Sequence, residues 1–211
     1  MHNSFTKDTF QTICDELASA DKVLSGIIAA HGYPPMWLRA NTYETLVHII
    51  LEQQVSLASA LAALKKLQEH TKGIAPKSIL GMSDEDLRAC YVCRQKAVYI
   101  RHLATAIESK QIELEKLATL PDDEVRAILI ALKGIGNWTT DVYLMFVLQS
   151  ADIFPIGDLA AVNSMKRAYN LPRDTPREEL SKFTERWQPY RTVATMILWH
   201  HYLSAPIKRG K

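Results

Sequence analysis

The segment Ala131–Thr140, with the sequence ALKGIGNWTT, holds residues that could bind an anion. Glycine permits a positive φ and lets a ligand come close to the backbone, and this segment has Gly134 and Gly136. The N–H groups of such a turn, with those that open the next helix, form a site suited to one phosphate. Lys133 adds a cation beside the turn, and the apolar Ile135 is expected to point inward and fix it. The alternative is an ordinary corner at which glycine only ends a helix.

A second candidate functional residue is Asp158, in the segment Asp152–Ala160 with the sequence DIFPIGDLA. It lies twenty residues after Trp138 and directly precedes an apolar helical stretch. An aspartate at such a place is ordinarily an N-cap, whose carboxylate accepts hydrogen bonds from the first turn. A helix N-terminus also favours a negative charge.

Helices are predicted on both sides of these residues. An apolar periodic stretch at 46–67 is interrupted at Ser56, which predicts two helices. Further helices are predicted at 84–90, 94–108, 122–132, 138–148, 159–169, 177–187 and 190–203. The side chains expected to cap helices are Asn41 (with Glu44), Ser56, Ser83 (with Asp86), Asn137 and Asp158, and prolines stand at three helix starts, Pro121, Pro176 and Pro189.

The connections between these predicted helices are short and polar or contain glycine, as a helical bundle requires. The sequence shows no strand alternation beyond chance, no internal repeat and no low-complexity tract. At 211 residues it suits one domain or two small lobes. We predict an all-α, two-lobed helical bundle in which residues 1–211 form a single unit, with a helical hairpin at about 122–149.

Composition limits the partners and the compartment. From Asp158 onward ten Lys or Arg stand against five acids, in a chain of net charge +2. This basic third favours an anionic partner on one face, although solvated helix faces would give the same pattern. The cysteines Cys14, Cys90 and Cys93 are too few for a disulfide framework and indicate a reducing compartment, and their lone CxxC pair predicts no metal site.

The sequence has no signal peptide and no apolar run of the roughly 20 residues that a membrane helix needs. We therefore expect an intracellular protein without membrane contact, in the cytoplasm of a bacterium or the nucleus of a eukaryote.

The string Leu132-x-Gly-Ile-Gly-x-Trp-Thr139 resembles the helix-hairpin-helix DNA glycosylase superfamily, whose hairpin binds the DNA backbone. The resemblance implies that Lys133, Gly134, Ile135, Gly136 and Thr139 contact phosphate, which positions the protein without reading bases. It also implies that the aspartate after the hairpin's second helix, here Asp158, is catalytic. A carboxylate can stabilise the oxocarbenium-like sugar of a breaking N-glycosidic bond and can activate the attacking water; which role dominates is left open.

Two branches of the superfamily are disfavoured by what the chain lacks. Bifunctional members carry a lysine just after the hairpin glycines that forms a Schiff base with the sugar, and this sequence has Trp138 there. The resemblance thus implies a monofunctional enzyme that leaves an abasic site. The iron–sulfur branch needs four cysteines near its C-terminus, and no cysteine follows Cys93. We expect no iron–sulfur cluster and no cofactor.

Tryptophan at position 138 is typical of the 3-methyladenine DNA glycosylase II family, and the segment Trp187–Trp199 resembles that family's final helix. The resemblance runs from about Asn41 to Leu203. It implies a base pocket lined by Trp138 and Trp199, because a purine alkylated at N3 or N7 is cationic and is attracted to indole faces. Core packing is the alternative for both tryptophans. Some relatives carry an aromatic residue directly after the catalytic aspartate, where this sequence has Leu159, and Val142 follows Asp141 one turn after Trp138; these departures leave the substrate range open.

The enzyme must flip its target base out of the duplex and fill the vacated stack. Gln53 and Gln54 match the family's intercalating position at the end of a helix, and Gln54 is the better candidate. Paired glutamines at a helix end are otherwise ordinary surface residues.

The sequence therefore predicts a monofunctional glycosylase for alkylated purines, acting as a monomer on double-stranded DNA with damaged bases. We expect the hairpin and Asp158 to line a DNA-facing cleft between the lobes. Two alternatives stand beside this prediction: a glycosylase for another lesion, and a non-catalytic protein that uses the hairpin only to bind phosphate. Asp158 favours an enzyme, since a carboxylate beside DNA would repel phosphates.

Overall fold

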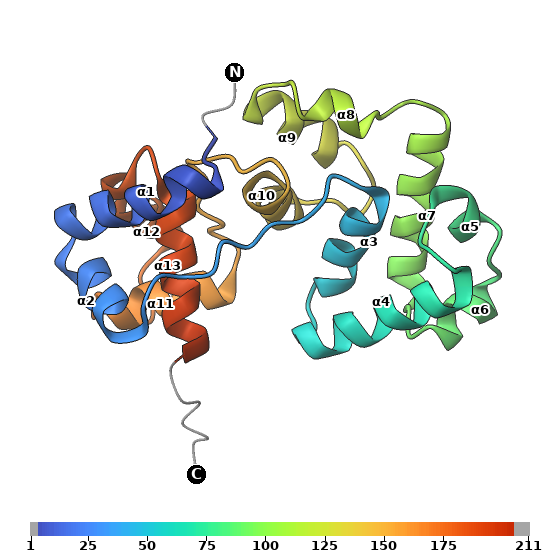
Figure 1. Ribbon diagram of the computed structural model, residues 1–211. Coiled ribbons are helices and arrows are strands. Elements are labelled where there is room, and N and C mark those ends of the chain that lie inside the picture. The colour runs from blue at the N-terminus through green and yellow to red at the C-terminus, as the bar shows by residue number, and fades with distance from the viewer. Residues whose placement is uncertain (1–3, 205–211) are drawn as a thin grey trace, which may run out of the picture. The chain divides into compact units, whose positions relative to one another are not determined.

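The structure is a computed structural model that describes residues 4–204. Across this range one helix follows another, and the part of the chain that is described contains no strand, only an isolated bridge between Ser4 and Ser150 (Figure 1). The predicted all-α fold is confirmed. The chain divides into two compact units, which are described separately below.

Unit 1 is the continuous segment Arg39–Tyr143. Its long helix α7 packs against α3, α5 and α6, and α3 also packs against α4. The core between them is aliphatic, with Leu46, Ile50, Ile79 and Ile100 fully buried. The helices of the unit are α3 (Tyr43–Glu52), α4 (Leu57–Thr71), α5 (Pro76–Leu80), α6 (Asp84–Ala89), α7 (Arg94–Glu108), α8 (Leu114–Leu117), α9 (Asp122–Ile130) and most of α10 (Asn137–Phe146).

Unit 2 combines both ends of the chain, residues up to Leu38 and residues from Leu144. Helix α13 is at its centre and packs against α1, α2 and α11. Trp187 is fully buried, and its indole N–H donates to Asp21, the residue that caps α2. The helices are α1 (Lys7–Ala20), α2 (Lys22–His31), α11 (Leu159–Ala168), α12 (Arg177–Thr184), the short 3-10 helix η1 (Glu185–Trp187) and α13 (Arg191–Ser204).

Several predicted helix ends are confirmed by the structure. Helix α7 has the predicted bounds, Ser56 caps α4, and Ser83 caps α6 with Asp86 in a capping box. Asp158 caps α11, whose Ala161 N–H donates to its carboxylate. A capping side chain thus sets the start of α4, α6 and α11, whereas α7 begins without a side-chain cap.

Two predicted caps are wrong. Thr42, not Asn41, caps α3, and the amide of Asn41 instead donates to the carbonyl oxygen of Leu114 at 2.8 Å and accepts from Tyr143 at 2.7 Å. Asn137 is the first residue of α10, and its side chain accepts from Arg126. In both cases the side chain that was predicted to cap a helix forms hydrogen bonds with residues of another helix instead.

Within residues 4–204 no helix has the length and apolarity to cross a membrane. Among the same residues, no group of three or more His, Cys, Asp or Glu side chains is placed to hold a metal ion. The basic residues Lys208, Arg209 and Lys211, counted in the charge of the C-terminal third, lie outside the described residues.

Candidate functional site

The predicted hairpin consists of α9, the turn 131–136 and α10. Gly134 has a φ of +88°, which strongly favours glycine. A Cβ at this position would lie 2.1 Å from Cγ of Tyr99, well inside van der Waals contact. The turn therefore rests directly on an aromatic ring of α7, and Gly134 is required by packing as well as by backbone conformation.

Gly136 has a different environment. Its φ is outside the left-handed region, and a Cβ there would meet no atom within 4 Å. Of the two glycines of the turn, Gly134 alone uses a positive φ. Its carbonyl oxygen accepts from the N–H of Thr140 at 3.0 Å, the first bond of the ten-residue helix α10. Gly136 and Asn137 are exposed, so the start of this helix faces open space, as an anion site at a helix N-terminus requires.

Three other hairpin residues were predicted to contact phosphate. Lys133 is exposed beside the turn. Ile135 is buried as expected, with 4% of its surface exposed, and its N–H donates to Leu132. The side chain of Thr139 is also buried, and its hydroxyl accepts a hydrogen bond from Gln53 at 2.9 Å. The predicted phosphate contact of Thr139 stays a prediction, and the burial of the hydroxyl favours a contact through the main chain.

Arg126 joins the two helices of the hairpin. Its guanidinium donates to Asp141 Oδ1 at 2.5 Å and to Asn137 Oδ1 at 3.2 Å. Asp141 is only 5% exposed, and burial raises its pKa above the usual range, although Arg126 acts in the opposite direction. One cation from α9 thus compensates a buried carboxylate on α10.

The two glutamines at the predicted intercalating position, Gln53 and Gln54, differ in their contacts. Gln53 is half-buried, and its amide nitrogen donates to the carbonyl oxygen of Gly134 and to the hydroxyl of Thr139, both at 2.9 Å. These two hydrogen bonds hold the Gln53 side chain within the hairpin, and its intercalation stays an untested prediction. Gln54 is exposed and has a φ of +57°. Gln54 stays the better candidate for intercalation.

The two predicted pocket tryptophans lie in different units. Trp138 is half-buried in the first turn of α10, in unit 1. Trp199 is half-buried on α13, in unit 2, which also contains Asp158. The structure brings Trp199 and Asp158 into direct contact: the indole Nε1–H donates to Asp158 Oδ1 at 3.0 Å. Neither tryptophan is a fully buried core residue.

Asp158 is both a helix cap and a partner of an indole. Its Oδ1 accepts from Ala161 N–H at 2.8 Å as well as from Trp199. Capping, the simpler interpretation of this residue, is correct, and the second hydrogen bond orients the same carboxylate beside an aromatic ring.

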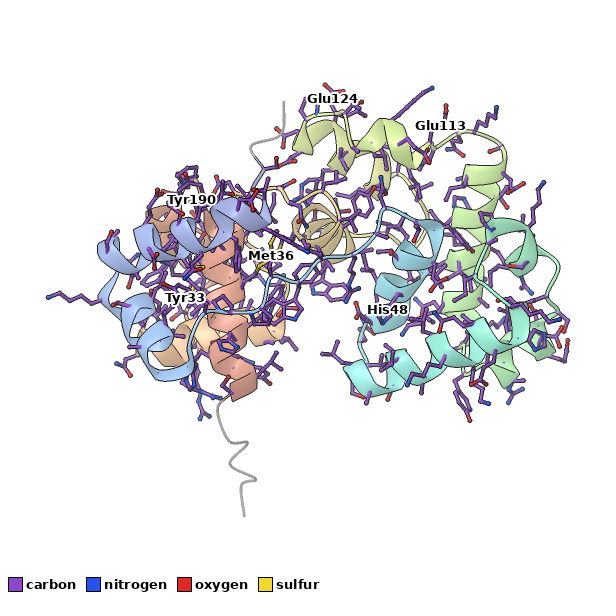
Figure 2. The ribbon with its side chains drawn as sticks, viewed as in Figure 1. Tyr33, Met36, His48, Glu113, Glu124 and Tyr190 are labelled. Atoms are coloured by element: carbon purple, nitrogen blue, oxygen red, sulfur yellow. The ribbon has the colours of Figure 1, made fainter. Side chains whose placement is uncertain are left out.

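Three aromatic side chains gather next to this carboxylate within unit 2. The ring centroid of Trp199 lies 5.4 Å from that of Phe146 and 6.3 Å from that of Trp37. The ring centroids of Trp37 and Phe146 are 6.4 Å apart. Trp37 comes from the extended segment after α2, where Met36 is labelled in Figure 2. We call Trp37, Phe146 and Trp199 the aromatic cluster. Sequence reasoning missed Trp37 and Phe146, although a tryptophan two residues after Pro35 and outside every predicted helix was a usable signal for Trp37.

The segment that leads to Asp158 is anchored on the start of α13. Arg191 donates to both carboxylate oxygens of Asp152, at 2.7 and 2.9 Å. The N–H of Ile153 donates to the hydroxyl of Thr192 at 3.0 Å, and that hydroxyl donates to the carbonyl oxygen of Ser150. Such bidentate and buried contacts hold a loop in one geometry. The loop therefore presents Asp158 from a fixed support.

A carboxylate beside electron-rich rings suits a definite chemistry. Indole and phenyl faces attract a cationic or electron-poor ring. A fixed carboxylate stabilises positive charge that develops next to it. The arrangement in unit 2 can therefore bind a flat, cationic group and favour a bond cleavage that leaves a cation near Asp158.

Comparisons with known proteins agree with this chemistry. The HhH-GPD superfamily base excision DNA repair protein family matches residues 47–189. DNA-3-methyladenine glycosylase 1 of Schizosaccharomyces pombe is 30% identical over 165 residues, covering 76% of this chain and 72% of that protein. A Bacillus subtilis protein, YfjP, provisionally named a DNA-3-methyladenine glycosylase, is 27% identical over 184 residues, 83% of this chain and 64% of its own length.

The solved structure of Schizosaccharomyces pombe 3-methyladenine DNA glycosylase in complex with abasic DNA is similar in fold, with a TM-score of 0.81 at 26% identity. The likeness covers 89% of this chain and 95% of that one. The residues matched by the family, 47–189, contain the hairpin, Gln53, Gln54 and Asp158.

Proposed function

The chain belongs to the HhH-GPD superfamily of base excision DNA repair proteins, and from that membership we propose that it is a monofunctional DNA glycosylase. It hydrolyses the N-glycosidic bond of alkylated purines of the 3-methyladenine and 7-methylguanine type. The observation that carries the proposal is the contact of Asp158 with Trp199 at the aromatic cluster. The names of the relatives, DNA-3-methyladenine glycosylases, support the same substrate class.

The reaction needs little from the protein beyond binding and charge. A purine alkylated at N3 or N7 carries a positive charge and leaves as a neutral base without an acid catalyst. The rings of Trp37, Phe146 and Trp199 offer electron-rich faces for that cation. As the bond breaks, positive charge moves to the sugar, where the Asp158 carboxylate stabilises it and orients the attacking water.

Double-stranded DNA is the partner, and the hairpin binds its backbone. Gly136 and the first turn of α10 receive a phosphate, with Lys133 beside it. Gln54 fills the stack that the flipped base leaves. We propose that the protein acts as a monomer, since the residues named here all belong to one copy of the chain and the reaction needs no second copy.

The product is an abasic site. Trp138 occupies the position at which bifunctional relatives carry the lysine that forms a Schiff base, and an indole nitrogen is no nucleophile for this step. The sugar is therefore left uncut after the base has gone.

We expect the purified protein to release 3-methyladenine and 7-methylguanine from methylated duplex DNA. The freed bases are identified by chromatography and mass spectrometry, and the DNA strand breaks only after alkali treatment. Borohydride is expected to trap no covalent protein–DNA complex. Release of oxidised or deaminated bases instead would replace the substrate class, and binding without any release would leave a non-catalytic DNA-binding protein. A trapped complex would reject the monofunctional mechanism.

The hairpin prediction separates DNA binding from catalysis. Gly136→Val adds bulk in open space without a φ penalty, so we expect a folded protein that binds damaged and undamaged duplex more weakly, with its preference for damage unchanged. Lys133→Ala should weaken binding less and reduce the slope of log K against log salt by about one unit, as loss of one phosphate contact does. Fluorescence anisotropy with labelled duplexes measures both. Parental affinity in folded Gly136→Val would show that the hairpin is only a structural corner.

A further inference from the structure

The carboxamide of Gln53 bridges the two sides of the hairpin turn. It is the C-cap of α3, and its nitrogen lies 2.9 Å from the carbonyl oxygen of Gly134 and 2.9 Å from the hydroxyl of Thr139. A carbonyl oxygen can only accept, so the nitrogen of the amide must face Gly134. Both of its N–H groups are thereby used on one short segment of chain, before and after Gly136. All of these residues belong to unit 1.

The end of α3 is held firmly by further contacts. Lys96 donates to the carbonyl oxygen of Leu51 at 2.7 Å. Glu52 is 8% exposed and accepts two hydrogen bonds from Arg39, at 2.7 and 2.9 Å. Charged, bidentate contacts of this kind fix a side chain and its backbone. Gln53 therefore projects from a rigid support.

The other partner of Gln53 is equally well supported. Gly134 rests on the ring of Tyr99, and the hydroxyl of Tyr99 accepts from Gln95 at 2.5 Å. Arg126 holds the start of α10 through Asn137. The hairpin turn and the end of α3 are thus two braced elements, and the Gln53 amide joins them.

The residue next to this bridge is the exposed Gln54, in the left-handed region at φ +57°. Such a conformation is uncommon for a residue with a Cβ and persists where the surroundings enforce it. The two hydrogen bonds of Gln53 fix the chain immediately before that turn. The direction in which Gln54 projects is therefore set by the hairpin.

We propose that Gln53 is a positioning residue that couples insertion of Gln54 into the duplex to the phosphate contact of the hairpin. The proposal rests on the proposed function, since it assigns Gln54 to the vacated stack and the hairpin to the backbone. A side chain that enters a base stack needs a support that does not yield. Gln53 ties Gln54 to the hairpin, which is also the element that holds the DNA backbone. The phosphate contact and the inserted Gln54 side chain therefore keep one relative geometry.

The test uses a readout that does not depend on base release. A duplex carries 2-aminopurine beside a stable abasic-site analogue, and its fluorescence rises when an inserted side chain unstacks it. With the parent protein we expect a rapid rise. Gln53→Met removes both donors at similar size and should slow the rise about tenfold, in keeping with the loss of two hydrogen bonds. Gln53→Glu keeps the shape but sets a carboxylate against the Gly134 carbonyl, and should slow it more.

Two controls separate coupling from a general loss of structure. Gln68 on α4 donates to Glu44 at 2.6 Å, so Gln68→Met makes the same chemical change elsewhere in unit 1 and should leave the rate unchanged. Thr139→Val removes one acceptor from the opposite side of the bridge and should slow the rise in the same sense as Gln53→Met. It also tests the bridge if Gln53→Met does not fold, which circular dichroism reports.

The decisive comparison is a double-mutant cycle. If Gln53 acts through Gln54, Gln53→Met added to Gln54→Ala should slow the rise no further, whereas independent effects multiply. Multiplying effects, a parental rate in Gln53→Met, or no fluorescence rise with the parent protein would each overturn the proposal. Base release is measured separately on methylated DNA. A parent that unstacks 2-aminopurine but releases no base would reject the glycosylase activity and leave the coupling intact.

Discussion

Asp158→Asn is expected to abolish base release while the fold stays intact. The amide oxygen of asparagine can still accept from Ala161 N–H and Trp199 Nε1–H, and asparagine is as good an N-cap as aspartate. What is lost is the negative charge next to the developing sugar cation. Removal of one such stabilising group costs about 10²–10³-fold in rate, and more where it also orients the water.

Single-turnover base release from methylated duplex DNA measures the loss of activity. Binding to a duplex with an abasic-site analogue measures the affinity for DNA. We expect unchanged or tighter binding, because the substitution also removes a repulsion between carboxylate and phosphate. Asp174 is an exposed aspartate of the same unit, so Asp174→Asn makes the same change of net charge and should release base at the parental rate. Near-parental turnover by Asp158→Asn would limit Asp158 to capping α11.

Arg126→Met is expected to have the largest effect on stability. It leaves the Asp141 carboxylate, 5% exposed, without its cation, and breaking a buried ion pair in this way costs about 3–5 kcal/mol. Replacing both partners by apolar residues, as in Arg126→Met with Asp141→Leu, should recover most of that loss. Urea denaturation of the parent, the single variant and the double variant measures the free energies of unfolding.

The loss of stability in Arg126→Met should also depend on pH in a defined direction. Burial raises the pKa of Asp141, so the folded protein binds this proton more tightly than the unfolded chain does. The contribution of Asp141 to stability therefore rises as the pH falls, and it is lost as the pH increases through the raised pKa. Without Arg126 the pKa goes up further. We expect the deficit of Arg126→Met to shrink between pH 7 and about pH 4, and a deficit that stays constant would contradict an uncompensated charge.

Much of the fold could be predicted because its signals are local. The apolar stripe of α7 and the side chains of Ser56, Ser83 and Asp158 act within one or two turns of chain, and the structure has helices with these ends. Helices α1 and α2 escaped prediction although Asp21, a sound N-cap, stands between them. The local signal for these two helices was present in the sequence but was not used.

The candidate site was less predictable because its contacts join distant parts of the sequence. Trp37 meets Trp199 across 162 residues of chain, and nothing near either residue announces the partner. Gln53 was assigned to the duplex because its neighbours match an intercalating motif, but the oxygen atoms that receive its amide belong to residues 134 and 139. Motif spacing identifies a functional segment, whereas tertiary hydrogen bonding decides which of its residues is exposed.

The split composition of unit 2 sets an order of events during synthesis. Unit 1 is one uninterrupted segment and can begin to fold as soon as it leaves the ribosome, whereas α1 and α2 need α13, which follows unit 1 along the chain. Domains form as their chain emerges, and contacts between distant residues form late because a long loop must close. Asp158 meets its indole partner only after position 199 has been translated. Under the proposed function, a nascent or prematurely terminated chain that holds a completed hairpin would bind DNA but release no base.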